Sequence, residues 1–343
     1  MSLVLRVAGD RWRTHLRAVA EAHPGIVPVI KGNGYGLGLS RLARRAGWLG
    51  APTAAVGTYA EVPEVGPRFD GDLLVLSPWR PWIERGPYDD RLIHTVGRVE
   101  DLQALADRGD RPRVVLECLT SMHRHGLTPT QLHTAARALP GVHLAGVALH
   151  LPMAGDRLAE VESWIGRIHA SGLATDRLYV SHLADHELAA LRSRHPDLVL
   201  LPRIGTALWL GDREALEVRA TVLDRHRVTR GQRVGYRQRR VRSSGTLLIV
   251  SGGTSHGIGL EAPNATVSSR QRAGVLARGG LQAAGLALSP FTVAGRRRWF
   301  AEPPHMQASM LFLPGTVSPP AVGEELAADV RFTTTRFDRI EIT

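Results

Sequence analysis

The sequence predicts a (β/α)8 TIM-type barrel in residues 1–211, followed by a mostly β domain in residues 212–343. Two observations lead to this fold class. Short apolar runs alternate with amphipathic helical patterns eight times before about residue 210, a rhythm typical of a closed barrel of parallel strands. After Gly211 the helical periodicity fades, and short strand-like runs are separated by glycine and proline.

The predicted elements follow from these runs. The barrel strands are expected at Ile26–Ile30, Ala54–Gly57, Leu73–Leu76, Leu92–Val96, Val114–Glu117, Gly146–Leu149, Leu178–Val180 and Val199–Leu201. The clearest helical patterns are Leu39–Leu49, Val99–Arg108, Pro129–Leu139, Arg157–Ser171 and Asp185–Arg194. In the second domain we expect strands at Ala220–Val222, Arg233–Tyr236, Thr246–Val250 and Asp329–Phe332.

The composition is that of a globular protein with a sizeable core. The chain has 343 residues, 43% of them hydrophobic, and a mean hydropathy of -0.09. No apolar run approaches the roughly 20 residues of a membrane helix, and the N-terminus lacks the features of a secretion signal. The single cysteine, Cys118, excludes an internal disulfide, and no Cys/His spacing resembles a zinc site. We therefore expect a cytoplasmic protein with no membrane association and no metal.

The formal net charge of +11 raises the question of a nucleic-acid partner. The arginine clusters at Arg237–Arg242 and Arg296–Arg298 are short, and aromatic residues make up only 5% of the chain. No helix-turn-helix, RRM or zinc-finger signature accompanies them. We interpret the charge as an arginine-rich solvated surface and do not expect nucleic acid as a partner.

One basic residue differs from all the others. Of the 43 lysines and arginines, 42 are arginine and one is lysine, Lys31. An arginine side chain stays protonated and is not a nucleophile, so it cannot replace a lysine in covalent chemistry. Lys31 lies in the glycine-rich segment Val29–Gly38, at the end of the first predicted barrel strand. It is a candidate catalytic residue; the alternative is a chance survivor in a glycine turn.

Barrel enzymes place their chemistry at the carboxyl ends of the strands. Six predicted ends carry polar groups, which are Lys31, Ser77, Glu117 with Arg124, His150, Ser181 with His182, and Arg203. A lysine there is placed to form a Schiff base with an aldehyde, and Tyr35 can return over the same pocket. The turn Arg203–Thr206 fits the phosphate site that barrels often build after the last two strands. Together these residues indicate a site for pyridoxal 5'-phosphate.

Four segments resemble the alanine racemase family of fold-type III pyridoxal phosphate enzymes. The segment Val29–Gly38, VIKGNGYGLG, is similar to the cofactor motif of that family. Ser121–Leu127 is similar to its Gly-Met-x-Arg-x-Gly segment, and Ala148–His150 to the segment of its strand-six histidine. Arg203–Gly211 is similar to its Arg-x-Gly-Ile-Ala-Leu-Tyr-Gly segment. The resemblance covers the whole barrel and, more loosely, the β domain.

The resemblance implies how the cofactor is bound. Lys31 would hold pyridoxal phosphate as an internal aldimine and act as the acid and base on one face of the substrate. The groups that correspond to the phosphate ligands of the family are Tyr35, Ser181 (or its neighbour His182), and the backbone N–H groups of Gly205 and Thr206.

It also assigns roles to charged residues. Arg203, supported by His150, would face the pyridine nitrogen, leaving the ring unprotonated and a weaker electron sink, which limits transamination. Arg124 would approach the substrate carboxylate or the ring hydroxyl. Seven residues before this arginine the family often has a carbamylated lysine, and this chain has Glu117. Its carboxylate could orient Arg124 directly; the alternative is a core-facing glutamate paired elsewhere.

The β domain departs from the family pattern. The family's second base is a tyrosine in a Gly-Tyr-Ala-Asp-Gly segment, donated by the other subunit of a dimer. The matching stretch here, Gly245–Gly257, has no tyrosine. His256 is a candidate replacement because histidine suits proton transfer; the alternative is an exposed loop histidine. Tyr236 is a further candidate for the missing tyrosine. The family's Cys-Met-Asp segment, which shapes the substrate end of the pocket, appears as His305 followed by Met306 and Gln307.

Two functions remain after this comparison. The first is a pyridoxal phosphate-dependent amino-acid racemase, an isomerase working as a homodimer, with Lys31 and His256 as its two bases. The second is a pyridoxal phosphate-binding carrier or regulator without turnover. Arg203 favours the enzyme, since a carrier needs no group that tunes the electronics of the ring. The altered β domain fits an amino-acid substrate larger or more polar than alanine, or a reaction other than racemisation.

Overall fold

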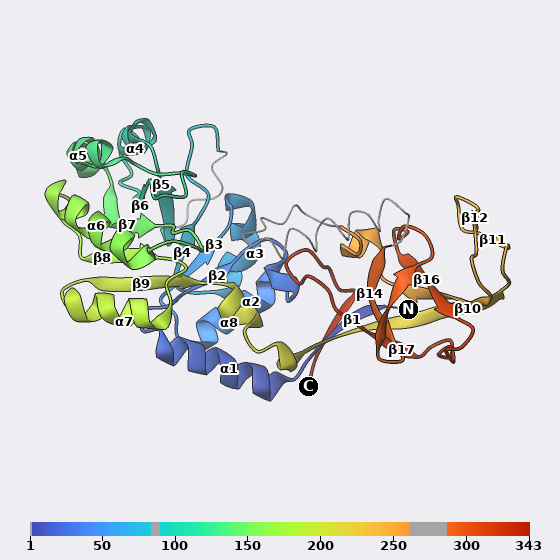
Figure 1. The fold of residues 1–343 in the computed structure, drawn as a ribbon. Helices are drawn as coiled ribbons and strands as arrows, with labels where there is room; N and C mark the ends of the chain where they lie inside the picture. Colours follow the sequence, from blue (N-terminus) through green and yellow to red (C-terminus); the bar gives the residue numbers. More distant parts are fainter. Residues whose placement is uncertain (1, 84–89, 261–286) are drawn as a thin grey trace. The chain divides into compact units, whose positions relative to one another are not determined.

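The computed structural model describes residues 2–83, 90–260 and 287–343 (Figure 1). The chain forms two compact units, one made of Arg13–Gly211 and the other of Met1–Trp12 with Asp212–Thr343. The first unit contains a closed barrel of eight parallel strands, and the second contains a largely antiparallel sheet. The predicted fold class, a TIM-type barrel with a mostly β C-terminal domain, is confirmed.

All eight predicted barrel strands are present. They are β2 (Val27–Ile30), β3 (Thr53–Val56), β4 (Asp72–Val75), β5 (Leu92–Val96), β6 (Arg113–Cys118), β7 (His143–Leu149), β8 (Arg177–Val180) and β9 (Val199–Ile204). Each strand pairs in parallel with the next, and β2 closes the barrel by pairing with β9. The apolar runs located these strands because strands that are buried on both faces read as nearly continuous hydrophobic segments.

Helices cover the outside of the barrel (Figure 1). Their bounds are α1 (Gly9–Ala22), α2 (Leu39–Trp48), α3 (Val62–Val65), α4 (Val99–Ala106), α5 (Pro129–Ala138), α6 (Arg157–Ala170), α7 (Asp185–Arg194) and α8 (Thr206–Leu210). The sequence sets several of their starts. Thr128 and Gln131 form a capping box at α5, and the carboxylate of Asp156 accepts the N–H of Ala159 at α6.

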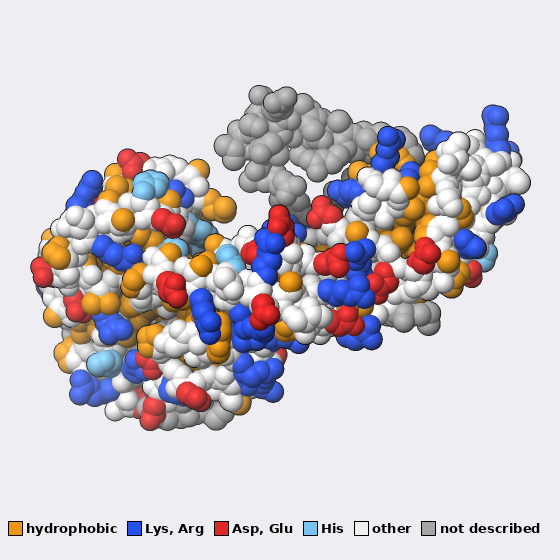
Figure 2. All heavy atoms as spheres, turned by 90° about the horizontal axis from the view of Figure 1, so that it is seen from below, with side chains coloured by type: hydrophobic (Ala, Val, Ile, Leu, Met, Phe, Trp, Pro, Cys, Tyr) orange, Lys and Arg blue, Asp and Glu red, His pale blue; other side chains and the backbone are white. Residues whose placement is uncertain are grey.

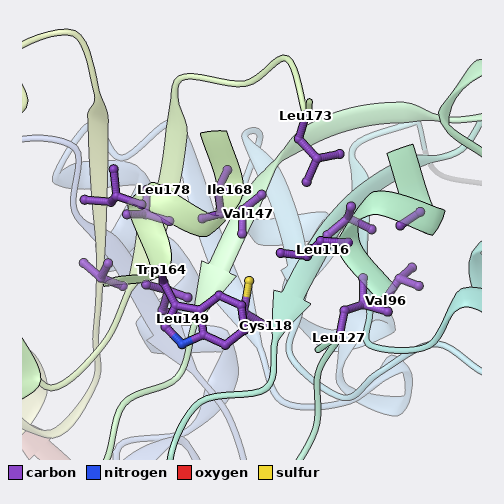
Figure 3. Packing of buried hydrophobic residues seen from close by; sticks show 14 of the residues in the cluster. Val96, Leu116, Cys118, Leu127, Val147, Leu149, Trp164, Ile168, Leu173 and Leu178 are labelled. Carbon is purple, nitrogen blue, oxygen red and sulfur yellow. The ribbon is translucent and has the colours of Figure 1, made fainter. Parts of the chain in front are cut away.

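The core of the barrel has two layers because successive side chains of a strand point to opposite faces. In β6, Val115 belongs to the interior layer, and its neighbour Leu116 belongs to the layer under the helices. Figure 3 shows this outer layer, where Leu116, Val147 and Leu149 lie near Trp164 of α6 and Cys118. The Cys118 thiol is buried there, and burial raises its pKa.

The second unit is built on one eight-stranded sheet in the order β13-β16-β15-β14-β17-β10-β1-β18. Its strands are β1 (Leu3–Val7), β10 (Leu216–Val228), β13 (Gly245–Ser251), β14 (Leu288–Val293), β15 (Arg296–Phe300), β16 (Ala308–Pro314), β17 (Glu325–Ala328) and β18 (Arg339–Ile342). A short hairpin, β11 (Arg233–Val234) with β12 (Arg239–Arg240), forms a separate pair. The predicted strands at Ala220–Val222 and Thr246–Val250 lie within β10 and β13.

The structure differs from the sequence prediction at three places. The barrel was expected from residue 1, but the first residues form β1, which pairs with β10 and β18 of the other unit. The strand predicted at Asp329–Phe332 is wrong, since β17 ends at Ala328 and the N–H of Asp329 bonds to the carbonyl of Pro290. The strand predicted at Arg233–Tyr236 ends at Val234, because Gly235 turns the chain with a φ of 71°.

On the face of the molecule in Figure 2, arginine side chains are interspersed with aspartate and glutamate over both units. This mixture is what we expect of an arginine-rich solvated surface. Among the described residues, no helix combines the length and the apolar character needed to cross a membrane.

The outer layer of the barrel core generates a stability prediction. Leu116→Ala should lower the free energy of unfolding by about 2–5 kcal/mol, because the side chain is fully buried and its removal leaves a cavity. Chemical denaturation would measure the loss. Val199→Ala is the control, since Val199 is exposed in β9 and its truncation should cost less than about 1 kcal/mol. Equal losses in both variants would contradict the assignment of Leu116 to the core.

Candidate active site at the mouth of the barrel

The interior face of the barrel changes from apolar to charged at the carboxyl ends of the strands. Interior-layer residues in five of the strands are Val29, Val115, Ala148, Tyr179 and Leu201. Two residues beyond each of them stands a polar residue: Lys31, Glu117, His150, Ser181 and Arg203. Residues two apart in a strand share a face, so these five side chains gather at one end of the barrel. The strand ends therefore bring together the residues that the sequence singled out.

The loop that carries Lys31 is held by a carboxylate that the sequence analysis missed. Glu61, in the short helix η2 (Tyr59–Glu61), accepts the backbone N–H of Gly32 at 2.7 Å and that of Gly57 at 2.6 Å. It also accepts the N–H of Thr58 at 3.2 Å, as expected for a Thr-x-x-Glu helix start. That pattern at 58–61, directly after the second barrel strand, was the available signal. Glu61 therefore joins the first two strand ends of the barrel.

The amine of Lys31 is in a largely cationic environment. Burial lowers its pKa, and the charges of Arg124 and Arg203 lower it further, while Glu61 opposes them. A lowered pKa means that a larger fraction of the amine is neutral at a given pH. The neutral amine is the nucleophile, so this environment favours covalent chemistry at Lys31.

Tyr35 and Gly205 connect the first and last strand ends. The Tyr35 side chain is buried, and burial raises its pKa to about 12, so the phenol stays protonated. A Cβ atom at position 205 would lie 2.1 Å from the Tyr35 hydroxyl. Glycine at 205 is therefore what allows the hydroxyl to lie against the start of α8. Trp209 of α8 donates its indole N–H to the carbonyl of Val29 at 2.7 Å and holds the two segments together.

Arg203 is a buried cation with an unused donor. Its Nη2 donates to the carbonyl of Leu149 at 2.9 Å, whereas its Nε has no partner within the described ranges. Burial lowers the pKa of Arg203, and the carboxylate of Glu117 partly counteracts this. The guanidinium still remains protonated, because its ordinary pKa is so high. A buried N–H without a partner is costly unless a bound group accepts it.

Glu117 faces two arginines. It is buried, and burial raises its pKa, while Arg203 and then Arg124 act in the opposite direction. Its Oε2 has no hydrogen-bond partner among the described residues, and no hydrogen bond joins it to Arg124. The stronger electrostatic partner of Glu117 is Arg203, although the sequence analysis assigned it to Arg124. Arg124 lies in an exposed turn between β6 and α5.

His150 and Ser181 form a pair at the ends of β7 and β8. The Ser181 hydroxyl lies 2.9 Å from Nδ1 of His150 and accepts the backbone N–H of Leu151. Burial, with the charges of Arg203 and Arg124, lowers the pKa of His150 to about 3. When neutral His150 accepts a hydrogen bond from the Ser181 hydroxyl at Nδ1, its own ring proton is on Nε2. The neighbouring His182 is exposed and packs its ring edge-on to that of His150.

In the second unit, the structure places His256 in the interior. His256 ends the short helix η6 (Thr254–His256) and is 6% exposed, so the alternative of an exposed loop histidine does not hold. Its Nε2 lies 3.0 Å from Oδ1 of Asp338, and its Nδ1 accepts the N–H of Gly253. Both ring nitrogens thus already have partners. Met306 and Gln307 are exposed and lie next to this helix, because Ser255 bonds to both.

The fold and the site together define a class of protein: a (β/α)8 barrel whose mouth presents one lysine amine among fixed cations, followed in the chain by a β domain. The family model of the alanine racemase N-terminal domain matches residues 7–209. The chain belongs to this family, as the resemblance of the glycine-rich segment predicted.

Curated relatives are alanine racemases that match part of the chain. The protein of a Nitratiruptor species is 29% identical over 145 residues, 40% of each chain. That of Campylobacter curvus is 30% identical over 127 residues, and that of Mycobacterium tuberculosis is 26% identical over 209 residues. The chain spans 40%, 35% and 52% of the lengths of these three relatives.

Solved structures have the same fold over nearly the whole chain. Alanine racemase from Bartonella henselae, with covalently bound pyridoxal phosphate, has a TM-score of 0.74 at 17% identity, covering 100% of both chains. Alanine racemase from Bacillus anthracis, with bound L-Ala-P, has a TM-score of 0.72 at 18% identity, covering 96% of this chain and 86% of that one. A histidine racemase from Leuconostoc mesenteroides has a TM-score of 0.70 at 16% identity, covering 99% of this chain and 98% of that one. At these identities the comparisons establish the fold.

The cationic surroundings of Lys31 generate a prediction about pH. Acylation of Lys31 by an amine-reactive reagent should reach half its maximal rate at a lower pH in the folded than in the unfolded protein. Arg124→Gln should move that midpoint upward, because a positive neighbour that lowers the pKa is removed. Peptide mass spectrometry would follow the label. Arg44→Gln, on the exposed face of α2, is the matched control and should leave the midpoint unchanged. An unchanged midpoint in Arg124→Gln as well would refute the effect of Arg124 on the pKa of Lys31.

Proposed function

We propose that this protein is a pyridoxal phosphate-dependent amino-acid racemase that works as a homodimer. The strongest support is the position of Lys31, the only lysine of the chain, at the barrel mouth, where its pKa is lowered. The buried Arg203 lies at the same mouth, and its Nε–H has no partner among the described residues. The membership of the chain in the alanine racemase family supports the same activity.

The residues at the mouth fit the cofactor. A pyridine nitrogen is an acceptor without a proton of its own, and it would satisfy the buried Nε–H of Arg203. The phosphate would be bound by the N–H groups of Gly205 and Thr206 and by the Tyr35 hydroxyl, which glycine at 205 allows to lie beside them. Ser181 is a further candidate ligand, although here its hydroxyl already pairs with His150.

When bound, the cofactor supplies an electron sink conjugated to the substrate α-carbon. Lys31 would hold it covalently, and its Nζ would carry a proton to or from one face of the substrate α-carbon. Glu61 fixes the loop so that this nitrogen stays in place. Arg203 would leave the ring nitrogen unprotonated, and this favours simple proton return over transamination. Arg124, with Glu117 nearby, would bind the substrate carboxylate.

Inversion at the α-carbon also needs an acid and base on the opposite face. In this proposal the β domain of a second subunit supplies it. His256 is the candidate from the sequence, and Met306 and Gln307 would shape the substrate end of the pocket. The proposed substrate class is a small-molecule amino acid.

The first test is cofactor capture. Incubation with pyridoxal phosphate followed by borohydride should leave one stable adduct on the peptide that contains Lys31. Arginine cannot form such an adduct, so the rest of the chain offers only the N-terminal amine as a competitor. Lys31→Arg keeps the positive charge and should abolish the adduct, and Arg44→Lys is the control that adds a surface lysine. A Lys31→Arg protein that still carries a reducible adduct within the barrel would refute the assignment.

The second test is exchange of the α-proton in D2O. Each enantiomer of a panel of amino acids would be incubated with the loaded protein, with NMR for the α-proton and chromatography for chirality. We expect exchange accompanied by inversion for at least one amino acid. Covalent capture without exchange of any substrate would instead support a cofactor carrier.

A further inference from the structure

A histidine and a buried carboxylate form a fixed pair in the β domain. Glu302 is 4% exposed, and its Oε1 accepts the Nε2–H of His305 at 2.6 Å. Its Oε2 accepts the backbone N–H of Tyr236 at 2.9 Å. Both carboxylate oxygens are therefore in use. Gly235 is necessary for this packing, because a Cβ there would lie 2.1 Å from Oε2.

The backbone that carries His305 is also fixed. Pro303 and Pro304 precede it, and proline restricts the φ angle. The N–H of His305 donates to the carbonyl of Ala308 at 2.9 Å, and its own carbonyl accepts the N–H of Thr254 at 2.7 Å. His305 is thus held through its side chain and through both of its backbone polar groups. Such rigidity is what a proton-transfer group requires.

The pair leaves one nitrogen of His305 available. A neutral histidine that donates from Nε2 presents a lone pair on Nδ1. Within the described ranges Nδ1 makes no hydrogen bond, and the side chain is 31% exposed. Two exposed apolar side chains flank it: Met306, at 68% exposure, and Tyr236, at 86%, whose ring centre lies 4.8 Å from that of His305.

The other histidines of this domain lack that combination. His256 is buried with partners at both nitrogens, so it must lose a hydrogen bond before it can accept a proton. His226 pairs with Asp224 at 3.3 Å, but both side chains are more than half exposed and the pair is not fixed by burial. His305 alone among these three combines a buried orienting carboxylate, a ring nitrogen with no hydrogen-bond partner among the described residues, and a partly exposed side chain.

We propose that His305, oriented by Glu302, is the β-domain group that exchanges a proton with the substrate α-carbon on the face opposite Lys31. This inference rests on the proposed racemase function and replaces His256 in that role. His305 is the catalytic residue and Glu302 a positioning residue.

The proton transfer balances with solvent water as the only further reagent. In one direction Nδ1 of His305 takes the α-proton, and the electron pair of the C–H bond stays with the α-carbon and the system conjugated to it. The protonated Nζ of Lys31 then gives a proton to the other face of the same carbon. One inversion leaves His305 protonated and Nζ of Lys31 neutral. The reverse reaction restores both, and before a further turnover in the same direction His305 gives its proton to water and Lys31 takes one from water.

The test compares inversion with exchange on one face. His305→Asn keeps a donor toward Glu302 and should lower the rate of inversion about a hundredfold or more. One enantiomer should still exchange its α-proton with retention, because Lys31 serves that face. His226→Asn is the control and should keep both rates. If His305→Asn inverts at the wild-type rate, the role of His305 is wrong but the racemase function stands. The same conclusion follows if His305→Asn keeps inversion while His256→Asn or Tyr236→Phe loses it. Absence of any exchange in the wild type would overturn the racemase function itself.

A second readout needs no cofactor and no activity. In the cofactor-free protein, 15N NMR should report that His305 carries its proton on Nε2. Glu302→Gln places an amide donor beside that nitrogen, so the proton should move to Nδ1, and inversion should fall as in His305→Asn. A His305 tautomer that is the same in both proteins, or already Nδ1–H in the wild type, would overturn the orienting role.

Discussion

The site depends on the closure of the barrel between β2 and β9. Val27 pairs with Arg203 and Pro28 with Ile204, so the first and last strands of the barrel become neighbours. This pairing brings Lys31 and Arg203 to one mouth although 171 residues separate them in the chain. The Trp209 indole bond to Val29 and the contact of Tyr35 with Gly205 reinforce the same seam. A barrel left open there would separate the amine from the cation that lowers its pKa.

The charges at the mouth follow from that geometry. Arg203 is held in the interior by its hydrogen bond to the carbonyl of Leu149 and by the charge of Glu117. Its Nε–H finds no acceptor in the part of the chain that the structure describes. Burial and nearby arginines lower the pKa of both Lys31 and His150. The mouth therefore lowers the proton affinity of two of its basic groups while retaining a permanent cation. An anionic, aromatic ligand with a nitrogen acceptor suits such an environment, because it brings negative charge and a lone pair together.

The sequence predicted the features that depend on local patterns. The eight barrel strands were visible as apolar runs, and Lys31 stood out because arginine fills every other basic position. The role of Glu61 was missed, although its Thr-x-x-Glu start was readable. β1 was missed because its pairing partners lie more than 200 residues away, and no local pattern indicates such a partner. The Glu302–His305 pair depends in the same way on a hairpin glycine that packs against the carboxylate, a tertiary contact without a sequence signature.

The placement of β1 also affects how the chain is made. Leu3–Val7 is synthesised about 200 residues before its partner β10, and it also pairs with Arg339–Ile342 of β18, which follows later still. The barrel can be complete by Gly211, whereas an apolar strand with unpaired backbone edges must wait until β10 is synthesised. At about 5–20 residues per second, that wait of about 200 residues lasts roughly 10–40 s. During that interval β1 is an apolar strand open to pairing with other chains, and it gains its second neighbour only when β18 has been made.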